Sequence, residues 1–292
     1  MICTDQYNHR IVRWSPDAKE GVVVAGGNGP GVALNQLNLP RGLTIDKEKR
    51  DLLIADTENH RVLRWAIGAD EGEVVAGGNG QGAGLHQLNG PRCLAIEPSG
   101  AILIGDVWNH RVVRWAPGAE EGEVVAGGNG NGPGAHQLTW PYGLALGTGG
   151  AVLVADHLNN RVVRWKPGAK EGEVVAGGRG QGDDYDQLYA PCGLELDFSG
   201  RLFVADSGNH RVMRFLPNER RGDIVAGGND AGFELHQLSW PYGVALRRSG
   251  PDTFLLIADY GNHRIMKWEP GAARGEVIAG GNGVGSGLHQ LW

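Results

Sequence analysis

A block of about 50 residues recurs from one end of the chain to the other, and this period constrains the fold more than any other feature. Three short markers recur in phase. The Asn of an Asn-x-Arg motif stands at 8, 59, 109, 159, 209 and 262. Gln-Leu begins at 36, 87, 137, 187, 237 and 290, and Val/Ile-Ala-Gly-Gly ends at 27, 78, 128, 178, 228 and 281. A fixed period of this length is typical of proteins built from stacked structural repeats.

One unit, residues 141–190, shows how each repeat is expected to fold. Short apolar segments rich in Val and Leu alternate with Gly- and Asn-containing turns, and none of them has a helical period. We predict strands over 141–147, 150–156, 160–165 and 172–178, followed by a loop over 179–190. The 50 glycines among the 292 residues fit a chain with many turns between short strands.

Four antiparallel strands per unit, repeated about six times, predict a β-propeller. We expect a single all-β domain over 1–292, a six-bladed β-propeller of four-stranded antiparallel blades, with one blade split between the termini and lacking a strand. The start in mid-repeat favours a segment of a longer repeat chain over a monomeric domain that closes around a three-stranded blade. The repeats are expected at 40–90, 91–140, 141–190, 191–240 and 241–292, after a partial blade at 1–39.

Each repeat carries the same polar residues around one turn, as in ADTENHRVLRW at 55–65. We expect Asp56 to accept backbone N–H bonds of the turn, and the buried Arg61 guanidinium to use Asp56 as its acceptor. A catalytic site needs its residues once, so sixfold repetition favours a structural role. The ring that ends the third strand, such as Trp65, is expected to pack between blades. The predicted structural pairs are Asp56–Arg61, Asp106–Arg111, Asp156–Arg161, Asp206–Arg211 and Asp259–Arg264.

The pattern Pro-x-Gly-Leu-x-Leu, Gly-x-Leu-x-Val-Ala-Asp and Asn-His-Arg-Val-x-Arg-Trp resembles the NHL repeat. ADTENHRVLRW and ADSGNHRVMRF are close to the most diagnostic stretch of that family, and the resemblance covers nearly the whole chain. It implies a propeller, commonly of six blades, but one fold hosts many functions. NHL propellers occur as RNA- or protein-binding ends of tripartite-motif ubiquitin ligases and as the sensor half of bacterial receptor kinases. Peptidyl-amidoglycolate lyase is an enzymatic relative.

Residues that differ between repeats are the better candidates for function, because the scaffold does not require them in every blade. Those beside the Pro that starts each complete repeat, and those in the Asp-to-Asn turn, are expected on one face of the propeller. Exposed aromatic rings there suit a peptide, a sugar or an unstacked base, although they could instead cap the blade ends. The predicted binding face comprises Arg41, Arg92, Trp108, Trp140, Tyr142, His157, Trp240, Tyr242 and Tyr260, with Trp240, Tyr242 and Tyr260 clustered on the fifth complete repeat.

Other chemistries have weaker support in the sequence. The net charge of −6 is unlike that of a strongly basic nucleic-acid-binding protein, although a local basic patch is compatible with it. Repeated histidines more often anchor loops than bind metal, and the GDDYD loop at 182–186 fits a solvated acidic loop better than a Ca²⁺ site. We therefore expect no metal site, no cofactor and no catalytic residues.

Location is weakly constrained. The three cysteines are irregularly spaced and form no disulfide framework, which favours a reducing compartment. No apolar run long enough for a transmembrane span is present, and the N-terminal residues do not resemble a signal peptide. We expect a cytoplasmic protein that does not associate with membranes.

Three functions follow from these observations. The first is a non-catalytic binding scaffold that presents variable loops on one propeller face to a protein or peptide. The second is an RNA-binding or substrate-recruiting propeller of the ubiquitin-ligase kind, which would need a basic face. The third is a metal-dependent lyase, which would need unique His, Tyr and Arg residues that converge on one point. The near-identity of the repeats favours the first.

Overall fold

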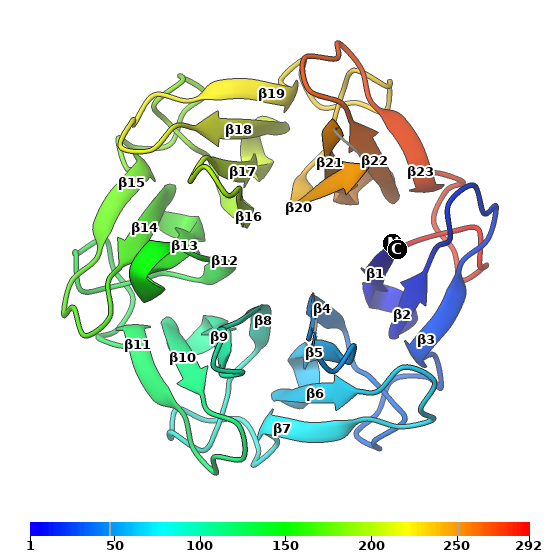
Figure 1. Ribbon diagram of the computed structural model, residues 1–292, viewed down its shortest axis with the longest axis vertical. Helices are drawn as coiled ribbons and strands as arrows, with labels where there is room; N and C mark the ends of the chain where they lie inside the picture. The colour runs from blue at the N-terminus through cyan, green and yellow to red at the C-terminus, as the bar shows by residue number, and fades with distance from the viewer. Residues whose placement is uncertain (47, 250–251) are drawn as a thin grey trace. The chain divides into compact units, whose positions relative to one another are not determined.

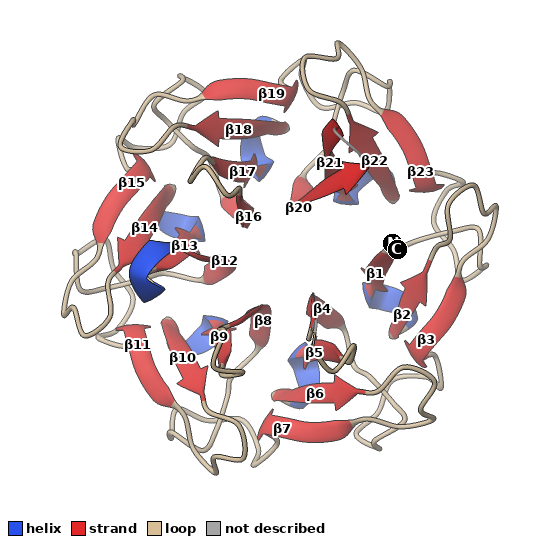
Figure 2. Ribbon diagram, in the orientation of Figure 1, coloured by secondary structure: helices blue, strands red, loops and turns tan. Residues whose placement is uncertain are grey.

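The fold is all-β, as the sequence predicts. The computed structural model describes residues 1–46, 48–249 and 252–292, and the helices of these residues are short 3-10 turns (Figure 2). Six antiparallel sheets make the chain a six-bladed β-propeller (Figure 1). The contacts divide it into two compact units, Met1–Pro141 with Trp292, and Tyr142–Leu291.

The first unit contains one three-stranded and two four-stranded sheets. The three-stranded sheet comprises β1 (Ile2–Asp5), β2 (Arg10–Arg13) and β3 (Val22–Gly26). The next comprises β4 (Pro40–Ile45), β5 (Leu52–Asp56), β6 (Arg61–Trp65) and β7 (Glu73–Gly77). The last comprises β8 (Pro91–Ile96), β9 (Ile102–Asp106), β10 (Arg111–Trp115) and β11 (Glu123–Gly127). The 3-10 turns η1 (Gln6–Asn8), η2 (Thr57–Asn59) and η3 (Val107–Asn109) follow β1, β5 and β9.

The second unit contains three four-stranded sheets. The first comprises β12 (Pro141–Leu146), β13 (Val152–Asp156), β14 (Arg161–Trp165) and β15 (Glu173–Gly177). The second comprises β16 (Pro191–Leu196), β17 (Leu202–Asp206), β18 (Arg211–Phe215) and β19 (Asp223–Gly227). The third comprises β20 (Pro241–Ser249), β21 (Asp252–Asp259), β22 (Arg264–Trp268) and β23 (Glu276–Gly280). The 3-10 turns are η4 (Thr148–Gly150), η5 (His157–Asn159), η6 (Ser207–Asn209) and η7 (Tyr260–Asn262). Strand order within every four-stranded sheet follows the chain.

Apolar side chains pack between neighbouring sheets of each unit. One cluster joins Ile11 of β2 and Leu37 to Leu52, Leu63 and Trp65 of the next sheet. Trp65 is almost fully buried, and its Nε1 donates to the carbonyl of Ala69 at 3.0 Å. The buried polar tip is therefore satisfied, and burial of such a ring contributes about 2–3 kcal/mol.

The repeated aspartate lies at the centre of a buried polar network. Asp56 has no exposed surface, and Arg61 Nε donates to its carboxylate at 2.7 Å. Asn59 Nδ2 donates to the same carboxylate at 2.8 Å, and the backbone amide of Asn38 donates at 2.6 Å. The expectation that Asp56 caps its own turn is wrong, because its side chain makes no capping hydrogen bond to η2. The carboxylate instead holds the chain that arrives from the preceding repeat.

The repeated arginine also reaches back along the chain. Arg61 donates through Nη1 to the carbonyl of Val32 at 2.7 Å and through Nη2 to the carbonyls of Ala33 and Gln36. These carbonyls belong to the long loop before β4. The same set of bonds from equivalent loops is made by Arg111, Arg211 and Arg264. Each loop is therefore fixed through its backbone, which leaves its side chains free to vary.

Strand direction gives each sheet two distinct ends. The turn end carries the 3-10 turns between the second and third strands and the first residues of the first strand, as the pairing of Pro40 with Asp56 shows. The hairpin end carries the connections between the first and second and between the third and fourth strands. All residues of the predicted binding face belong to turn ends by their place in these elements.

Candidate functional site

Two tyrosines stack at the turn end of the last sheet. Tyr242 is the second residue of β20, and Tyr260 is the first residue of η7. Pro241 pairs with Asp259 across the two strands, so their neighbours lie side by side. The ring centroids are 4.4 Å apart, and the ring planes differ by 15°. Such an offset pair presents a rigid apolar surface with two hydroxyl groups.

Trp240 lies at the same turn end and packs toward the preceding sheet. It is 40% exposed, and its ring centroid lies 5.4 Å from that of His210 and 6.3 Å from that of Tyr189. Its backbone amide donates to His210 Nδ1 at 3.1 Å. The indole is thus held in place while much of its surface stays open to a partner.

A third aromatic pair stands at the turn end of the first sheet in this unit. Tyr142 of β12 and His157 of η5 have ring centroids 4.1 Å apart, with 32° between their planes. His157 Nδ1 lies 3.2 Å from the carbonyl of Pro191 and 3.5 Å from Cys192 Sγ. We name the turn-end rings of the second unit the aromatic rim: Tyr142, His157, Tyr189, Trp240, Tyr242 and Tyr260.

The first unit carries the other residues of the predicted face. Trp108 of η3 is 41% exposed, and its ring centroid lies 6.1 Å from that of His60. Gly90 lies against the indole, since a Cβ there would stand 2.9 Å from the Trp108 ring. Arg41 and Arg92 are half-buried at the starts of β4 and β8, and Trp140 is half-buried just before β12.

The repeated histidine has a structural task at the turn end. His60 adopts a left-handed conformation with φ 52°, and its Nδ1 accepts the amide of Gly90 at 3.1 Å. In one repeat Asn160 replaces the histidine, and its Oδ1 accepts the amide of Ala190 at 2.9 Å. The acceptor must be an unprotonated ring nitrogen or an amide oxygen, so the histidine works in its neutral form. Burial lowers the pKa of His9, His210 and His263 and so favours that form.

Burial has the opposite effect on the repeated aspartates. Burial raises the pKa of Asp56, Asp106 and Asp206, while hydrogen bonds from asparagine, arginine and a backbone amide oppose the rise. In the described part of the chain, no group of three or more His, Cys, Asp and Glu side chains is placed to hold a metal ion. Among the same residues no helix is long and apolar enough to cross a membrane.

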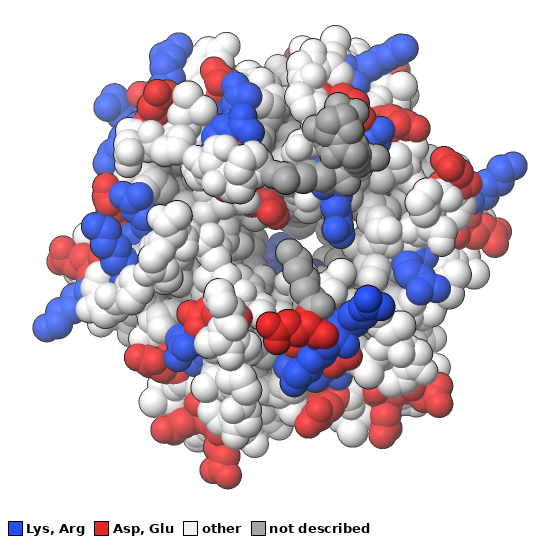
Figure 3. Space-filling model, in the orientation of Figure 1, with Lys and Arg blue, Asp and Glu red and all other residues white. Residues whose placement is uncertain are grey.

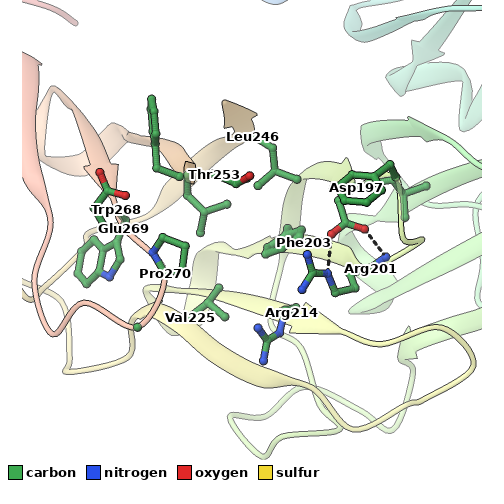
Figure 4. A pocket seen from close by; sticks show the side chains of 15 residues that line it. Asp197, Arg201, Phe203, Arg214, Val225, Leu246, Thr253, Trp268, Glu269 and Pro270 are labelled. Carbon is green, nitrogen blue, oxygen red and sulfur yellow. Dashed lines mark hydrogen bonds and ion pairs between the residues drawn. The ribbon is translucent and has the colours of Figure 1, made fainter. Parts of the chain in front are cut away.

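Sequence reasoning missed a cavity at the hairpin end of the second unit. The cavity has a volume of about 380 Å³ and lies between the sheets β16–β19 and β20–β23. Figure 4 shows Phe203 and Arg201 on one side and Leu246, Thr253 and Pro270 on the other. Phe198, which also lines it, is 81% exposed. The available signal was that Phe203 stands where other repeats have Leu53, Leu103 and Leu153.

The comparisons with known proteins agree with this fold. The NHL repeat family model matches residues 37–65 and 88–115. No curated protein sequence matches the chain. A chain in the crystal structure of the nidogen/laminin complex has a TM-score of 0.69 at 16% identity, over 95% of this chain and 92% of that chain.

Two further solved structures are similar. A streptogramin B lyase structure has a TM-score of 0.51 at 13% identity, over 82% of this chain and 67% of that chain. A structural genomics protein of unknown function from Bacteroides thetaiotaomicron has a TM-score of 0.64 at 15% identity, over 91% of this chain and 64% of that chain. Likeness at these identities shows the fold alone. Together with the family model, it supports an NHL-type β-propeller.

Proposed function

We propose that this protein is a non-catalytic binding scaffold whose aromatic rim binds a protein or peptide. The observation that carries the proposal is the stacked Tyr242–Tyr260 pair, together with the 40% exposed ring of Trp240 at the same turn end. Tyrosine and tryptophan held in fixed positions supply much contact area at little cost in side-chain entropy, which is why they dominate binding hot spots. The NHL-type propeller fold is compatible with a binding role in general.

The fold does not require aromatic residues at the places of Trp240 and Tyr242 in the repeat. The residues equivalent to Tyr242 in other repeats include Arg41, Arg92 and Cys192. Those equivalent to Trp240 include Leu39, Gly90 and Ala190. All of these repeats form the same four-stranded sheet. A residue type that the fold does not need, on an exposed end of the sheet, is free to serve recognition.

The net charge favours a peptide over RNA. It is −6. On the face that Figure 3 shows, which carries the hairpin ends, acidic and basic side chains are interspersed. RNA binding depends on a basic surface that neutralises phosphates. One similar chain comes from the nidogen/laminin complex, which is consistent with a protein partner.

Selection from a random peptide library displayed on phage tests the proposal. We expect selected peptides to lose at least about tenfold in affinity for Trp240→Ala or Tyr242→Ala, which corresponds to about 1.4 kcal/mol. Phe198→Ala is the matched control, because this exposed ring lies at the hairpin end. Circular dichroism verifies that each variant is folded.

Two results would contradict the proposal. Peptides that bind the rim variants as tightly as the unaltered protein, but lose affinity for Phe198→Ala, would place recognition at the hairpin end. Tight binding of single-stranded RNA that weakens steeply with salt, with no peptide selected, would favour an RNA-binding propeller.

A further inference from the structure

Several departures from the repeat meet at the cavity at the hairpin end of the second unit. Phe203 stands where other repeats have leucine, and Arg201 stands where two of them have Ala101 and Ala151. Both line the cavity, as does the exposed ring of Phe198. The other repeats form the same four-stranded sheet without these residues. The fold therefore does not require them, and their convergence on one cavity points to a ligand.

The opposite wall of the cavity is an extended hairpin. β20 continues to Ser249, past Leu246, whereas the equivalent strand β16 ends at Leu196. β21 starts correspondingly early, at Asp252, and contributes Thr253 to the lining. Figure 4 shows Leu246 and Thr253 across the cavity from Phe203. The last sheet thus adds a wall that the shorter hairpins of the other sheets do not form.

Most of the lining is apolar. Phe203, Leu255 and Trp268 are almost fully buried, and Val225 and Leu246 are half-buried. The volume of about 380 Å³ lies within the range of about 300–1,000 Å³ that is usual for small-molecule sites. Such a lining suits an aromatic or branched apolar group.

Arg214 supplies an unused hydrogen-bond donor to the cavity. Its Nη2 donates to Asp223 at 2.8 Å, but its buried Nε–H has no acceptor among the described residues. In an earlier repeat the equivalent Nε of Arg114 donates to Glu97 at 2.8 Å. The residue equivalent to Glu97 here is Asp197, and this carboxylate is taken by other donors. A buried donor that lacks an acceptor is costly, so a ligand that supplies one is favoured.

The acidic residues of the lining are already paired. Asp197 accepts the backbone amides of Ser199 and Arg201, each at 2.9 Å, and Arg201 Nε at 2.5 Å. Glu269 pairs with Lys267 Nζ at 2.7 Å. The charged groups that remain for a ligand are therefore guanidinium N–H donors, which select a carboxylate.

The two arginines and the phenylalanine share one face of their sheet. Phe203 pairs with Arg214 across β17 and β18. Arg201 precedes Phe203 by two residues and so lies on the same side of the sheet. The cationic groups thus lie next to an aromatic surface, and both belong to the wall opposite the extended hairpin.

We propose that this cavity binds a small carboxylate with an aromatic or branched apolar body. The body lies against Phe203, Leu246 and Trp268. The carboxylate accepts the Nε–H of Arg214, and the guanidinium of Arg201 is the second cation beside it. This site lies at the other end of the sheets from the aromatic rim and is independent of the function proposed for the rim.

The experiment titrates the full chain with phenylpropionate and with isocaproate, each beside its own neutral amide. We expect saturable binding of both acids, and the amides should bind at least about tenfold more weakly. NMR of the arginine Nε–H groups reports the place of binding. The signal of Arg214 should shift with either acid, and that of Arg164 should not.

Arg214→Met should bind acid and amide with equal affinity, because it keeps an apolar stem and removes the charged donor. Arg164→Met is the matched control. The Arg164 side chain is 33% exposed, against 34% for Arg214, and it pairs with Glu173 at 2.8 Å. Its Nε is also buried without an acceptor among the described residues, but Arg164 does not line this cavity. We expect this control to bind as the unaltered protein does.

Thr253→Trp tests the apolar part of the site. The larger side chain fills the space between the walls, so it should abolish binding of acids and amides alike. Circular dichroism verifies that the variant is folded. Trp240→Ala, at the rim, should bind the acids as the unaltered protein does, so a failure of the rim proposal leaves this one intact.

Four results would overturn the proposal. They are absence of saturable binding of both acids at millimolar concentration, equal affinity of the unaltered protein for acid and amide, an equal loss in Arg164→Met and Arg214→Met, and unchanged binding by folded Thr253→Trp. If Arg214→Met fails to fold, the comparison of acid with amide and the Arg214 signal of the unaltered protein decide.

Discussion

The side chain of Cys93 fills the space beside Gly105, so only one of these two residues can carry a side chain there. They are paired across β8 and β9, and a Cβ on Gly105 would overlap Cys93 Sγ. The corresponding residues of the next repeat are Gly143 and Ala155, where the side chain comes from the second strand instead. A Cβ on Gly143 would overlap the backbone carbonyl oxygen of Cys192 and would also lie 3.3 Å from Ala155 Cβ, so that site has no room for a second side chain either. In the β8–β11 sheet the side chain that fills this space therefore comes from the first strand, whereas in the next sheet it comes from the second.

Gly105→Ala should destabilise the protein by about 1–3 kcal/mol, because the added methyl group has no space beside the thiol. The double variant Cys93→Gly with Gly105→Ala recreates the arrangement of the other repeats and should recover most of that loss. Some loss should remain, since a Cβ at 105 also stands 2.8 Å from the carbonyl oxygen of Pro141. Urea unfolding of the unaltered protein, the two single variants Cys93→Gly and Gly105→Ala, and the double variant measures the effect, and additive losses would refute the exchange.

Arg211→Ala should lower the free energy of unfolding by about 3–5 kcal/mol, because it leaves the buried Asp206 carboxylate without its cation. The Arg211 side chain is 4% exposed, and its Nε lies 2.7 Å from Asp206. Arg179→Ala is the control, since its 3.2 Å pair with Asp186 joins a 64% exposed side chain to a 31% exposed one. We expect this control to cost about 1 kcal/mol or less. Equal losses in both variants would show that burial of the pair is unimportant.

The stability of the fold should fall as pH is lowered below about 6.5, the pKa of an unperturbed histidine. Burial lowers the pKa of His210 in the folded chain, so below this pH the unfolded chain takes up a proton that the folded chain resists. The contribution is fully present above pH 6.5 and is lost as pH falls through the folded pKa. Urea midpoints at pH 7.5 and pH 5.5 measure the fall.

His210→Asn should reduce this pH dependence and keep the fold, because Asn160 already fills the equivalent role with φ 51°. Asparagine tolerates the left-handed conformation and does not titrate. His236→Asn is the matched control, since it makes the same replacement in an exposed loop. A fall with pH that is the same in all three proteins would exclude His210 as its source.

Gly77→Ala should cost more than Gly80→Ala, although both residues have positive φ, at 67° and 77°. The left-handed backbone alone costs alanine about 1–2 kcal/mol at either site. A Cβ on Gly77 would also stand 2.5 Å from the carbonyl oxygen of His60, whereas one on Gly80 would meet nothing within 4 Å. Thermal unfolding should separate the variants, and equal melting temperatures would show that the site at Gly77 can relax.

The sequence predicted the fold because strand and turn signals recur in phase with the Asp-x-x-Asn-x-Arg set. The all-β propeller and its three-stranded sheet both follow from that period. The partners of the set did not follow, because they lie far along the chain. Asp56 bonds the amide of Asn38, and Arg61 bonds the carbonyl of Val32. Backbone donors and acceptors are the same in every residue type apart from proline, so these long-range bonds cannot be derived from side-chain chemistry.

The sequence predicted the aromatic residues of the candidate site but not the cavity at the hairpin end. Position in the repeat placed Tyr242 and Tyr260 at the same end of one sheet, and the structure stacks their rings. Repetition gave no account of Phe198 and Phe203, which line the cavity at the hairpin end. The cavity depends on how two sheets diverge, which is a property of their packing and not of either repeat.

Arg61, Arg111, Arg211 and Arg264 bind backbone carbonyls of the loop that precedes their sheet, so the folding of each sheet is coupled to that of the preceding loop. A fragment cut from one proline to the next would keep Asp206 and Arg211 but lose the carbonyls of Asp183 and Asp184 that Arg211 binds. The smallest piece able to fold would then straddle two sequence repeats. Duplication or deletion of a repeat would therefore be tolerated when the breakpoints lie within the repeats and keep each loop together with the arginine that binds it. Breakpoints at the prolines that begin the first strands would separate them.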